Sequence, residues 1–209
     1  HMLHHLLTRI DYPSIAGING VPWDAVELPS QFMENFAWNY DVLERCSAHA
    51  ETGDPLPQDL FQRLEESRHT GAALALMRQI EFGLFDMRLH AEYDPEAPSA
   101  VLSTLDEVRE EVSLVRHPAY NRLPQAFSHI FAGGYAAGYY SYKWAEVLAA
   151  DAFAAFEEAG IFDAPTAARF RHEILEIGGS RDFMQAYVDF RGRKPEIDAL
   201  LRQSGIVTS

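Results

Sequence analysis

The sequence predicts an all-α fold. Apolar residues recur at helical spacing through most of the 209 residues, the pattern of helices that bury one face. Pro and Gly residues interrupt this pattern at intervals, as they do where helices end. The composition, with 47% hydrophobic and 23% charged residues, is that of a globular protein. No internal repeat or low-complexity linker divides the chain, so we expect one helical domain over residues 1–209.

The first helix is expected to end before Tyr12-Pro13, because proline cannot continue a helix. Its apolar residues recur at helical spacing: Leu3, Leu6, Leu7 and Ile10. Residues 14–22 contain two glycines and a proline and are expected to form a loop. A second helix is expected from Asp24 to Cys46, with Pro29 either delaying its start or kinking it.

The sequence pattern in the middle of the chain predicts three more helices. A turn over residues 53–57 precedes a short helix at 57–68, and a long apolar-periodic helix follows over 70–93. Asp94-Pro95 breaks that helix, and Ser99 is a suitable N-cap for a helix over 100–115.

Four helices are expected in the last part of the chain, after an irregular segment at 117–124. An Ala-rich helix is predicted over about 135–159 and ends at Gly160. Shorter helices follow, and glycine-containing or proline-containing segments separate them: 164–177, 181–191 and 195–203. Arg191, Arg193 and Lys194, near the end of this region, are expected to form a solvated turn.

Charge and cysteine content argue against several classes of partner. The formal net charge is −14, which opposes binding to nucleic acids and acidic membranes, because both need basic protein surfaces. No apolar run reaches the roughly 20 residues that cross a bilayer. Cys46 is the only cysteine, so no internal disulfide can form. We therefore expect a cytoplasmic protein with neither a nucleic-acid nor a membrane partner.

Residues 23–35, Trp-Asp-Ala-Val-Glu-Leu-Pro-Ser-Gln-Phe-Met-Glu-Asn, gather acidic side chains at helical spacing. Acids beside apolar residues are costly unless they are solvated, paired or bound to a cation. Glu27 is therefore a candidate metal ligand. The alternative is a helix capping box, because Asp24-x-x-Glu27 has that spacing.

The first five residues offer three histidines as metal partners for Glu27. His1 and His5 share a helix face at i, i+4, but no Glu follows the first His as in the His-Glu-x-x-His zinc motif. His1, His5 and Glu27 would form a local zinc site. The alternative is that the histidines face solvent or the edge of the core. His1 and Met2 also fit a cloning remnant, or an initiator Met preceded by one residue.

A second candidate segment, residues 127–144, combines a Gly-Gly pair with His and Tyr residues. Gly133-Gly134 gives a flexible backbone before the expected helix, and Tyr135, Tyr139 and Tyr142 fall at i, i+4, i+7 on it. Phenol and imidazole groups donate hydrogen bonds well to an oxyanion. The alternative is an aromatic stripe that belongs to the core.

Both segments resemble the M3 family of zinc metallopeptidases, and the resemblance spans essentially the whole chain. It implies an all-α, multi-helix C-terminal portion of the catalytic domain, with Glu27 as the third zinc ligand and His1 as the second. In the second segment it implies that His129 and Tyr142 stabilise the tetrahedral intermediate. It further implies that His129, Tyr135, Tyr139 and Tyr142 bind the peptide.

The resemblance also implies what the intact enzyme needs: zinc, short peptide substrates and the N-terminal part of the peptidase. The first zinc His and the general-base Glu would lie in that N-terminal part, so we expect the isolated chain to be inactive. Two alternatives remain open. One is a non-catalytic helical module that binds a partner or self-associates. The other is a complementing fragment of a split peptidase.

Overall fold

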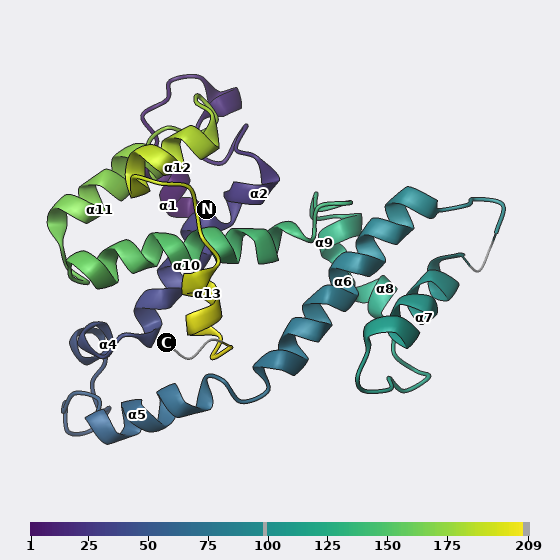
Figure 1. Ribbon diagram of the computed structural model, residues 1–209, viewed down its shortest axis with the longest axis horizontal. Helices are drawn as coiled ribbons and strands as arrows, with labels where there is room; N and C mark the ends of the chain where they lie inside the picture. Colours follow the sequence, from purple (N-terminus) through teal and green to yellow (C-terminus); the bar gives the residue numbers. More distant parts are fainter. Residues whose placement is uncertain (98–99, 207–209) are drawn as a thin grey trace. The chain divides into compact units, whose positions relative to one another are not determined.

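The computed structural model describes residues 1–97 and 100–206 and confirms the all-α prediction, with no strand among those residues (Figure 1). The chain forms two compact units. The first unit comprises residues 1–70 and the described residues from 144 onward, and the second unit comprises residues 71–143. Ser99, expected as an N-cap, lies outside the described residues.

The first unit is built from short helices around one long helix, α10. Its elements are α1 Met2–Leu7, η1 Pro13–Ile15, α2 Trp23–Val26, α3 Leu28–Glu34, η2 Asn35–Trp38, α4 Tyr40–Cys46, α5 Gln58–Ser67, α11 Ala164–Phe170, η3 Arg171–Leu175, α12 Phe183–Arg191 and α13 Asp198–Gln203. α10, Ser141–Ala159, begins in the second unit and continues into the first. α4 ends at Cys46, whose thiol is free and exposed.

The second unit contains the long helix α6, Ala72–Glu92, and α7, Ala100–Val112, which lie side by side in Figure 1. The short helices α8, Leu123–Ala126, and α9, Ser128–Phe131, complete it. Buried apolar side chains from these helices and the segments between them form one core, which consists of Phe85, Leu89, Leu105, Val108, Phe127, Ile130 and Tyr139. Of the aromatic residues that the sequence singled out, Tyr139 belongs to this core and Tyr142 packs against it.

A buried acid joins α6 to α7 inside the second unit. Glu81 is 1% exposed and accepts hydrogen bonds from Arg78 at 2.6 Å and Arg109 at 2.9 Å. Burial alone would raise the pKa of the Glu81 carboxyl, but the hydrogen bonds and charges of the two arginines outweigh it and leave the pKa lowered.

The single helix expected from Asp24 to Cys46 is wrong, because the segment divides into α2, α3, η2 and α4. α2 starts after Pro22, and Pro29 stands in the first turn of α3, where its missing N–H costs no hydrogen bond. Asn39 is extended and its side chain accepts from the Val42 N–H at 3.3 Å, so it starts α4 as a new helix.

The Ala-rich helix also starts later than predicted, at Ser141 rather than at about 135. Residues 136–140 form turns, and Ala137 has a positive φ of 54°. The predicted helix over 164–177 is α11 followed by the π-helical turn η3. The first helix ends at Leu7, earlier than the apolar spacing indicated.

α10 is the centre of the first unit's core. Its small side chains, such as Ala149 and Ala152, are buried and let neighbouring helices approach closely. Phe32 from α3 stacks on Phe170 from α11, with ring centroids 4.1 Å apart. This packing fixes α3, and with it the segment around Glu27.

The expectation that Arg191 and Arg193 are solvated is wrong for Arg191, whose side chain is only 9% exposed. Arg191 Nε donates to the Asp151 carbonyl at 3.1 Å, and Arg193 Nη2 donates to Asp151 Oδ1 at 2.6 Å. Asp151 is 1% exposed in the interior of α10. A buried acid attracts both cations, because an unpaired buried carboxylate would be costly.

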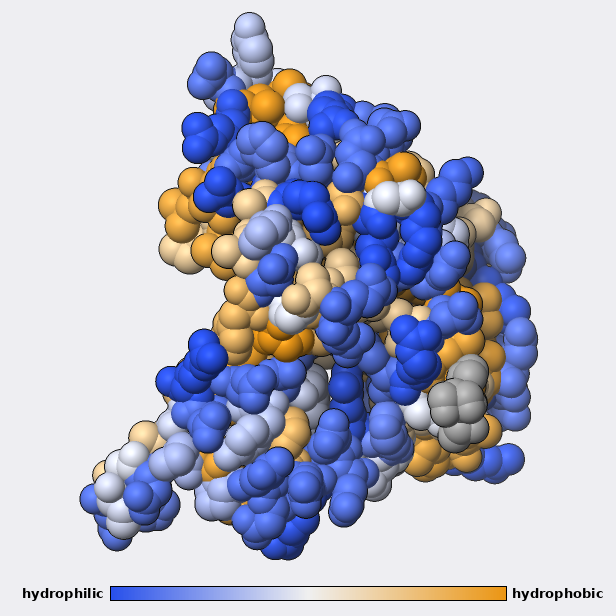
Figure 2. Space-filling view, turned by 60° about the vertical axis from the view of Figure 1, so that its left-hand side comes forward, coloured by the Kyte–Doolittle hydropathy of each residue, from blue (hydrophilic) through white to orange (hydrophobic). Residues whose placement is uncertain are grey.

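Hydrophilic residues cover most of the face seen in Figure 2, with hydrophobic residues exposed between them. No described helix is long and apolar enough to cross a membrane.

Candidate functional site

Glu27, the candidate metal ligand, lies in the first unit at the junction of α2 and α3. Its side chain is buried, 8% exposed, and its Oε1 lies 3.1 Å from His1 Nε2. The N-cap of α2 is Pro22, so Asp24 stands inside the first turn and the expected capping box does not form. The structure therefore brings together the two predicted metal ligands.

The separation of these two atoms fits a shared zinc ion. Two donors that each bind one tetrahedral zinc at about 2.0–2.1 Å stand roughly 3.3 Å apart. The observed 3.1 Å between imidazole nitrogen and carboxylate oxygen is the length of a direct hydrogen bond, and it also lies close to that value. Imidazole and carboxylate are also ligand types that zinc takes in catalytic sites. The donor set thus fits zinc as two of its three protein ligands.

The local zinc site of His1, His5 and Glu27 is not formed. In the described part of the chain, no group of three His, Cys, Asp or Glu residues is arranged to hold a metal ion. His4 is buried in the first unit at 1% exposure, whereas His5 is exposed. Burial lowers the pKa of the His4 imidazole to about 4.

The four aromatic site residues predicted from the second segment come together within the second unit. The Tyr135 and Tyr142 rings stack with centroids 4.9 Å apart, and Tyr139 lies 5.2 Å from Tyr142. The His129 ring stands edge-on to all three, at 5.7 to 6.2 Å. We call His129, Tyr135, Tyr139 and Tyr142 the aromatic cluster.

The cluster does not arise from one helix face, as the i, i+4, i+7 spacing predicted. Tyr135 lies just before the turns over residues 136–140, Tyr139 lies in them, and only Tyr142 lies in the helix. His129, on α9, is exposed, Tyr135 and Tyr142 are half-buried, and Tyr139 is buried at 9% exposure. The core-stripe alternative is thus right for Tyr139, whereas the other three rings keep exposed surface.

A buried carboxylate on α6 holds the turn that carries Tyr139. Asp86 is fully buried; its Oδ1 accepts from the Ala137 N–H and its Oδ2 from the Tyr139 N–H, both at 2.9 Å. Ala137 itself has a left-handed backbone conformation, which costs about 1 kcal/mol for a residue with a Cβ. The two hydrogen bonds offset that cost. His90 Nδ1 lies 2.8 Å from Asp86 Oδ1.

The phenol of Tyr139 is held by the same helix. Its hydroxyl donates to Gln79 Oε1 at 3.1 Å. Burial, together with the neighbouring Tyr142, raises the pKa of the Tyr139 phenol. Tyr139 therefore remains a neutral hydrogen-bond donor at physiological pH.

Sequence reasoning missed Asp86 and Gln79. Gln79, Gly83 and Asp86 recur at i, i+4, i+7 and so lie on one face of α6. A Cβ on Gly83 would stand 3.8 Å from the Cα of Tyr140, so this face packs closely against the turn. This spacing of two polar residues around a glycine on one helix face was the available signal.

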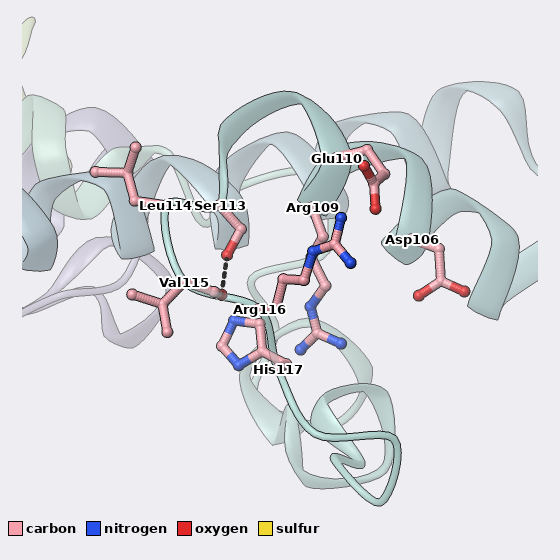
Figure 3. A pocket seen from close by; sticks show the side chains of 8 residues that line it. All are labelled: Asp106, Arg109, Glu110, Ser113, Leu114, Val115, Arg116 and His117. Atoms are coloured by element: carbon pink, nitrogen blue, oxygen red, sulfur yellow. Dashed lines mark hydrogen bonds between the residues drawn. The ribbon is translucent and has the colours of Figure 1, made fainter.

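A cavity of about 540 Å³ lies beside the C-terminal end of α7 (Figure 3). It is lined by Asp106, Arg109, Glu110, Ser113, Leu114, Val115, Arg116 and His117. The Ser113 hydroxyl donates to the Val115 carbonyl at 2.9 Å, as the dashed line shows. None of the predicted site residues lines this cavity, and its charges are mixed. Its size therefore carries no weight in locating the site.

Comparison with known proteins covers nearly the whole chain. The sequence model described as Peptidase family M3 matches residues 1–206. The chain is 55% identical over 206 residues to oligopeptidase A of Escherichia coli and 54% identical over 206 residues to that of Salmonella typhimurium. It is 35% identical over 210 residues to dipeptidyl carboxypeptidase of Escherichia coli. Each match covers 99% of the chain, which spans 30% of the length of these relatives.

Proposed function

This chain belongs to peptidase family M3, and from that premise we propose that it forms part of a zinc-dependent oligopeptidase that hydrolyses short peptides. The observation that carries the proposal is the 3.1 Å approach of His1 Nε2 to Glu27 Oε1. Both residues occupy positions at which the family resemblance places zinc ligands, and their separation fits a shared ion. The identity to oligopeptidase A relatives supports the same proposal.

In the proposed enzyme, His1 and Glu27 hold the zinc ion with one further ligand from the rest of the enzyme. Bound zinc supplies a Lewis acid for hydrolysis of a peptide carbonyl. Glu27 is suited to its role because it is buried at the junction of α2 and α3, and burial limits side-chain rotamers, as precise metal geometry requires.

The aromatic cluster supplies hydrogen-bond donors in the proposed enzyme. His129 and Tyr142 donate to the oxygen that becomes negatively charged as the peptide carbonyl is attacked. Tyr135, stacked on Tyr142, and Tyr139, packed behind it, orient the substrate and keep the Tyr142 ring in place. Donors fixed in advance cost no reorganisation during the reaction, which is why they accelerate it.

A polypeptide of residues 1–209 alone is expected not to hydrolyse peptides. It supplies two zinc ligands and contains no His-Glu-x-x-His motif with its general-base glutamate. The measurement is cleavage of an internally quenched fluorescent peptide by the purified chain with added zinc. Zinc-dependent cleavage that disappears in Glu27→Gln would contradict this expectation.

The proposed function is tested in a chimera. This chain replaces the matching 206-residue segment of Escherichia coli oligopeptidase A, to which it is 55% identical. We expect the chimera to hydrolyse the fluorescent peptide and to lose activity on treatment with a zinc chelator. An inactive but folded chimera would contradict the proposal.

Glu27→Gln in the chimera is expected to weaken zinc binding by about 100-fold, because the change removes a charged ligand from a buried site. Zinc affinity is measured by competition with a fluorescent chelator. Glu66→Gln, which changes an exposed acid of α5 in the same way, is the matched control and should leave affinity unchanged. Equal affinities for Glu27→Gln and the control would exclude Glu27 as a ligand.

Tyr142→Phe in the chimera is expected to lower kcat by about 100-fold with little change in KM, because a hydroxyl that donates only in the transition state does not bind the ground state. Tyr120→Phe serves as control, since Tyr120 is 79% exposed. Steady-state kinetics with the fluorescent peptide measure both constants. An unchanged kcat would remove Tyr142 from the catalytic residues.

A further inference from the structure

We infer that Asp86 is a positioning residue for the aromatic cluster: its buried carboxylate fixes the turn over residues 137–139 and thereby the orientation of Tyr139 and Tyr142. The inference rests on the proposed function, because it concerns how the cluster is presented to a peptide. Asp86 itself is fully buried and is not a candidate to touch substrate.

The Asp86 carboxylate accepts its hydrogen bonds from backbone N–H groups of the turn. Each carboxylate oxygen accepts one N–H from the turn, from Ala137 and from Tyr139, at 2.9 Å. A carboxylate satisfied in this way fixes both the position and the direction of the turn, because both oxygens have separate donors. His90, one helical turn further along α6, hydrogen-bonds through Nδ1 to the Asp86 backbone carbonyl, and the same nitrogen lies 2.8 Å from Oδ1.

The turn contains a strained residue that needs support from its surroundings. Ala137 has φ 54°, which residues other than glycine adopt rarely because the Cβ crowds the backbone. A strained residue persists where its surroundings over-determine it, and such residues gather at functional sites. Here the surroundings are the two hydrogen bonds to Asp86, beside the turn's own bond from the Gly138 N–H to the Tyr135 carbonyl at 2.8 Å.

Tyr139 connects the turn to the rings of the aromatic cluster. Tyr139 is held at its backbone N–H by Asp86 and at its hydroxyl by Gln79. Its ring packs 5.2 Å from Tyr142 and 5.7 Å from His129. Loss of the Asp86 carboxylate would free the Tyr139 backbone, and the displacement would reach Tyr142 through the ring contact.

The main test is Asp86→Asn in the full 209-residue chain, followed by NMR. The amide side chain can accept through only one oxygen, so one of the two backbone N–H groups loses its acceptor. Hydrogen exchange at Ala137 or Tyr139 is expected to accelerate by about tenfold. The ring-proton shifts of Tyr135 and Tyr142 should change, because their stacking determines the ring-current contribution. Asp106→Asn, at an exposed position of α7, is the control with the same change of charge.

A rescue separates positioning from general destabilisation. Glycine adopts φ 54° without the Cβ penalty, so Ala137→Gly added to Asp86→Asn should return the ring-proton shifts toward those of the unsubstituted chain. In the chimera, Asp86→Asn is expected to lower kcat by about tenfold with a smaller change in KM, as for a misplaced catalytic group. Ala137→Gly should recover part of that loss.

The outcomes distinguish this inference from the proposed function. Unchanged exchange and unchanged ring shifts in a folded Asp86→Asn chain would overturn the inference, whether or not the chimera is active. An inactive unsubstituted chimera would count against the proposed function alone. Should Asp86→Asn fail to fold, His90→Gln, which leaves the Asp86 charge in place, decides. Faster exchange at Ala137 supports the inference, and unchanged exchange overturns it.

Discussion

Asp151→Ala is expected to lower the free energy of unfolding of the first unit by about 3–5 kcal/mol, the usual cost of removing one partner from a buried ion pair. Asp151 is 1% exposed and accepts from the Tyr187 hydroxyl at 2.6 Å and from Arg193 at 2.6 Å. The change leaves the buried Tyr187 hydroxyl and the Arg191 guanidinium beside an empty volume. Burial, with Asp151 as acceptor, already raises the pKa of the Tyr187 phenol.

The measurement is urea denaturation followed by tryptophan fluorescence. Trp23, Trp38 and Trp144 all belong to the first unit, so the signal reports that unit. Glu157→Ala, at an exposed position of the same helix, is the control and should change stability by less than about 0.5 kcal/mol. A loss below about 1 kcal/mol for Asp151→Ala would show that Asp151 is not a major contributor to the stability of the first unit.

His4 is expected to make the first unit sensitive to mild acid. Its imidazole is 1% exposed, and neither ring nitrogen has a hydrogen bond of normal geometry. Burial lowers its pKa to about 4, and the positive amino terminus and His5 act in the same direction, whereas the nearby Ile174 backbone opposes them. An unfolded chain protonates this imidazole near pH 6.5. The unfolded state therefore binds more protons between pH 6.5 and 4, and stability falls as the pH falls through that range.

The loss attributable to His4 is about 2 kcal/mol by pH 5 and about 3 kcal/mol by pH 4. His4→Leu removes the titrating group and, since the ring makes no normal hydrogen bond, should leave stability at pH 7.5 within about 1 kcal/mol. Urea denaturation at pH 7.5 and pH 5 measures the difference between the two proteins. His5→Leu, at an exposed position, is the control. Parallel pH profiles for the unsubstituted chain and His4→Leu would refute the assignment.

The fold class and most helices were predictable because they depend on local pattern. The long apolar-periodic segment became α6, Ala72–Glu92, and the segment after Pro98 became α7. The predictions failed where contacts with residues distant in the sequence determine the backbone conformation. Apolar periodicity continues through Tyr135 and Tyr139. The backbone N–H groups of Ala137 and Tyr139 nevertheless donate to Asp86, more than 50 residues earlier, and α10 starts only at Ser141.

The sequence named the candidate site residues, but it did not predict how their side chains contact one another. The resemblance pointed to Glu27, His1 and the aromatic cluster, and the structure brings His1 to Glu27 and the four rings to one another. The hydrogen bonds by which Asp86 and Gln79 hold Tyr139 were not predicted. A buried Asp on a helix has the same sequence signature as a solvated one, and only the tertiary contact tells them apart.

The exposed thiol at the end of α4 has a practical consequence for any study of association. Cys46 is the sole cysteine and stands free at the surface, so two copies can join through it under oxidising conditions. Such a crosslinked pair would elute as a dimer and imitate the self-associating module considered above. A species that disappears when dithiothreitol is added, or in Cys46→Ser, reports oxidation during handling rather than a complementary surface.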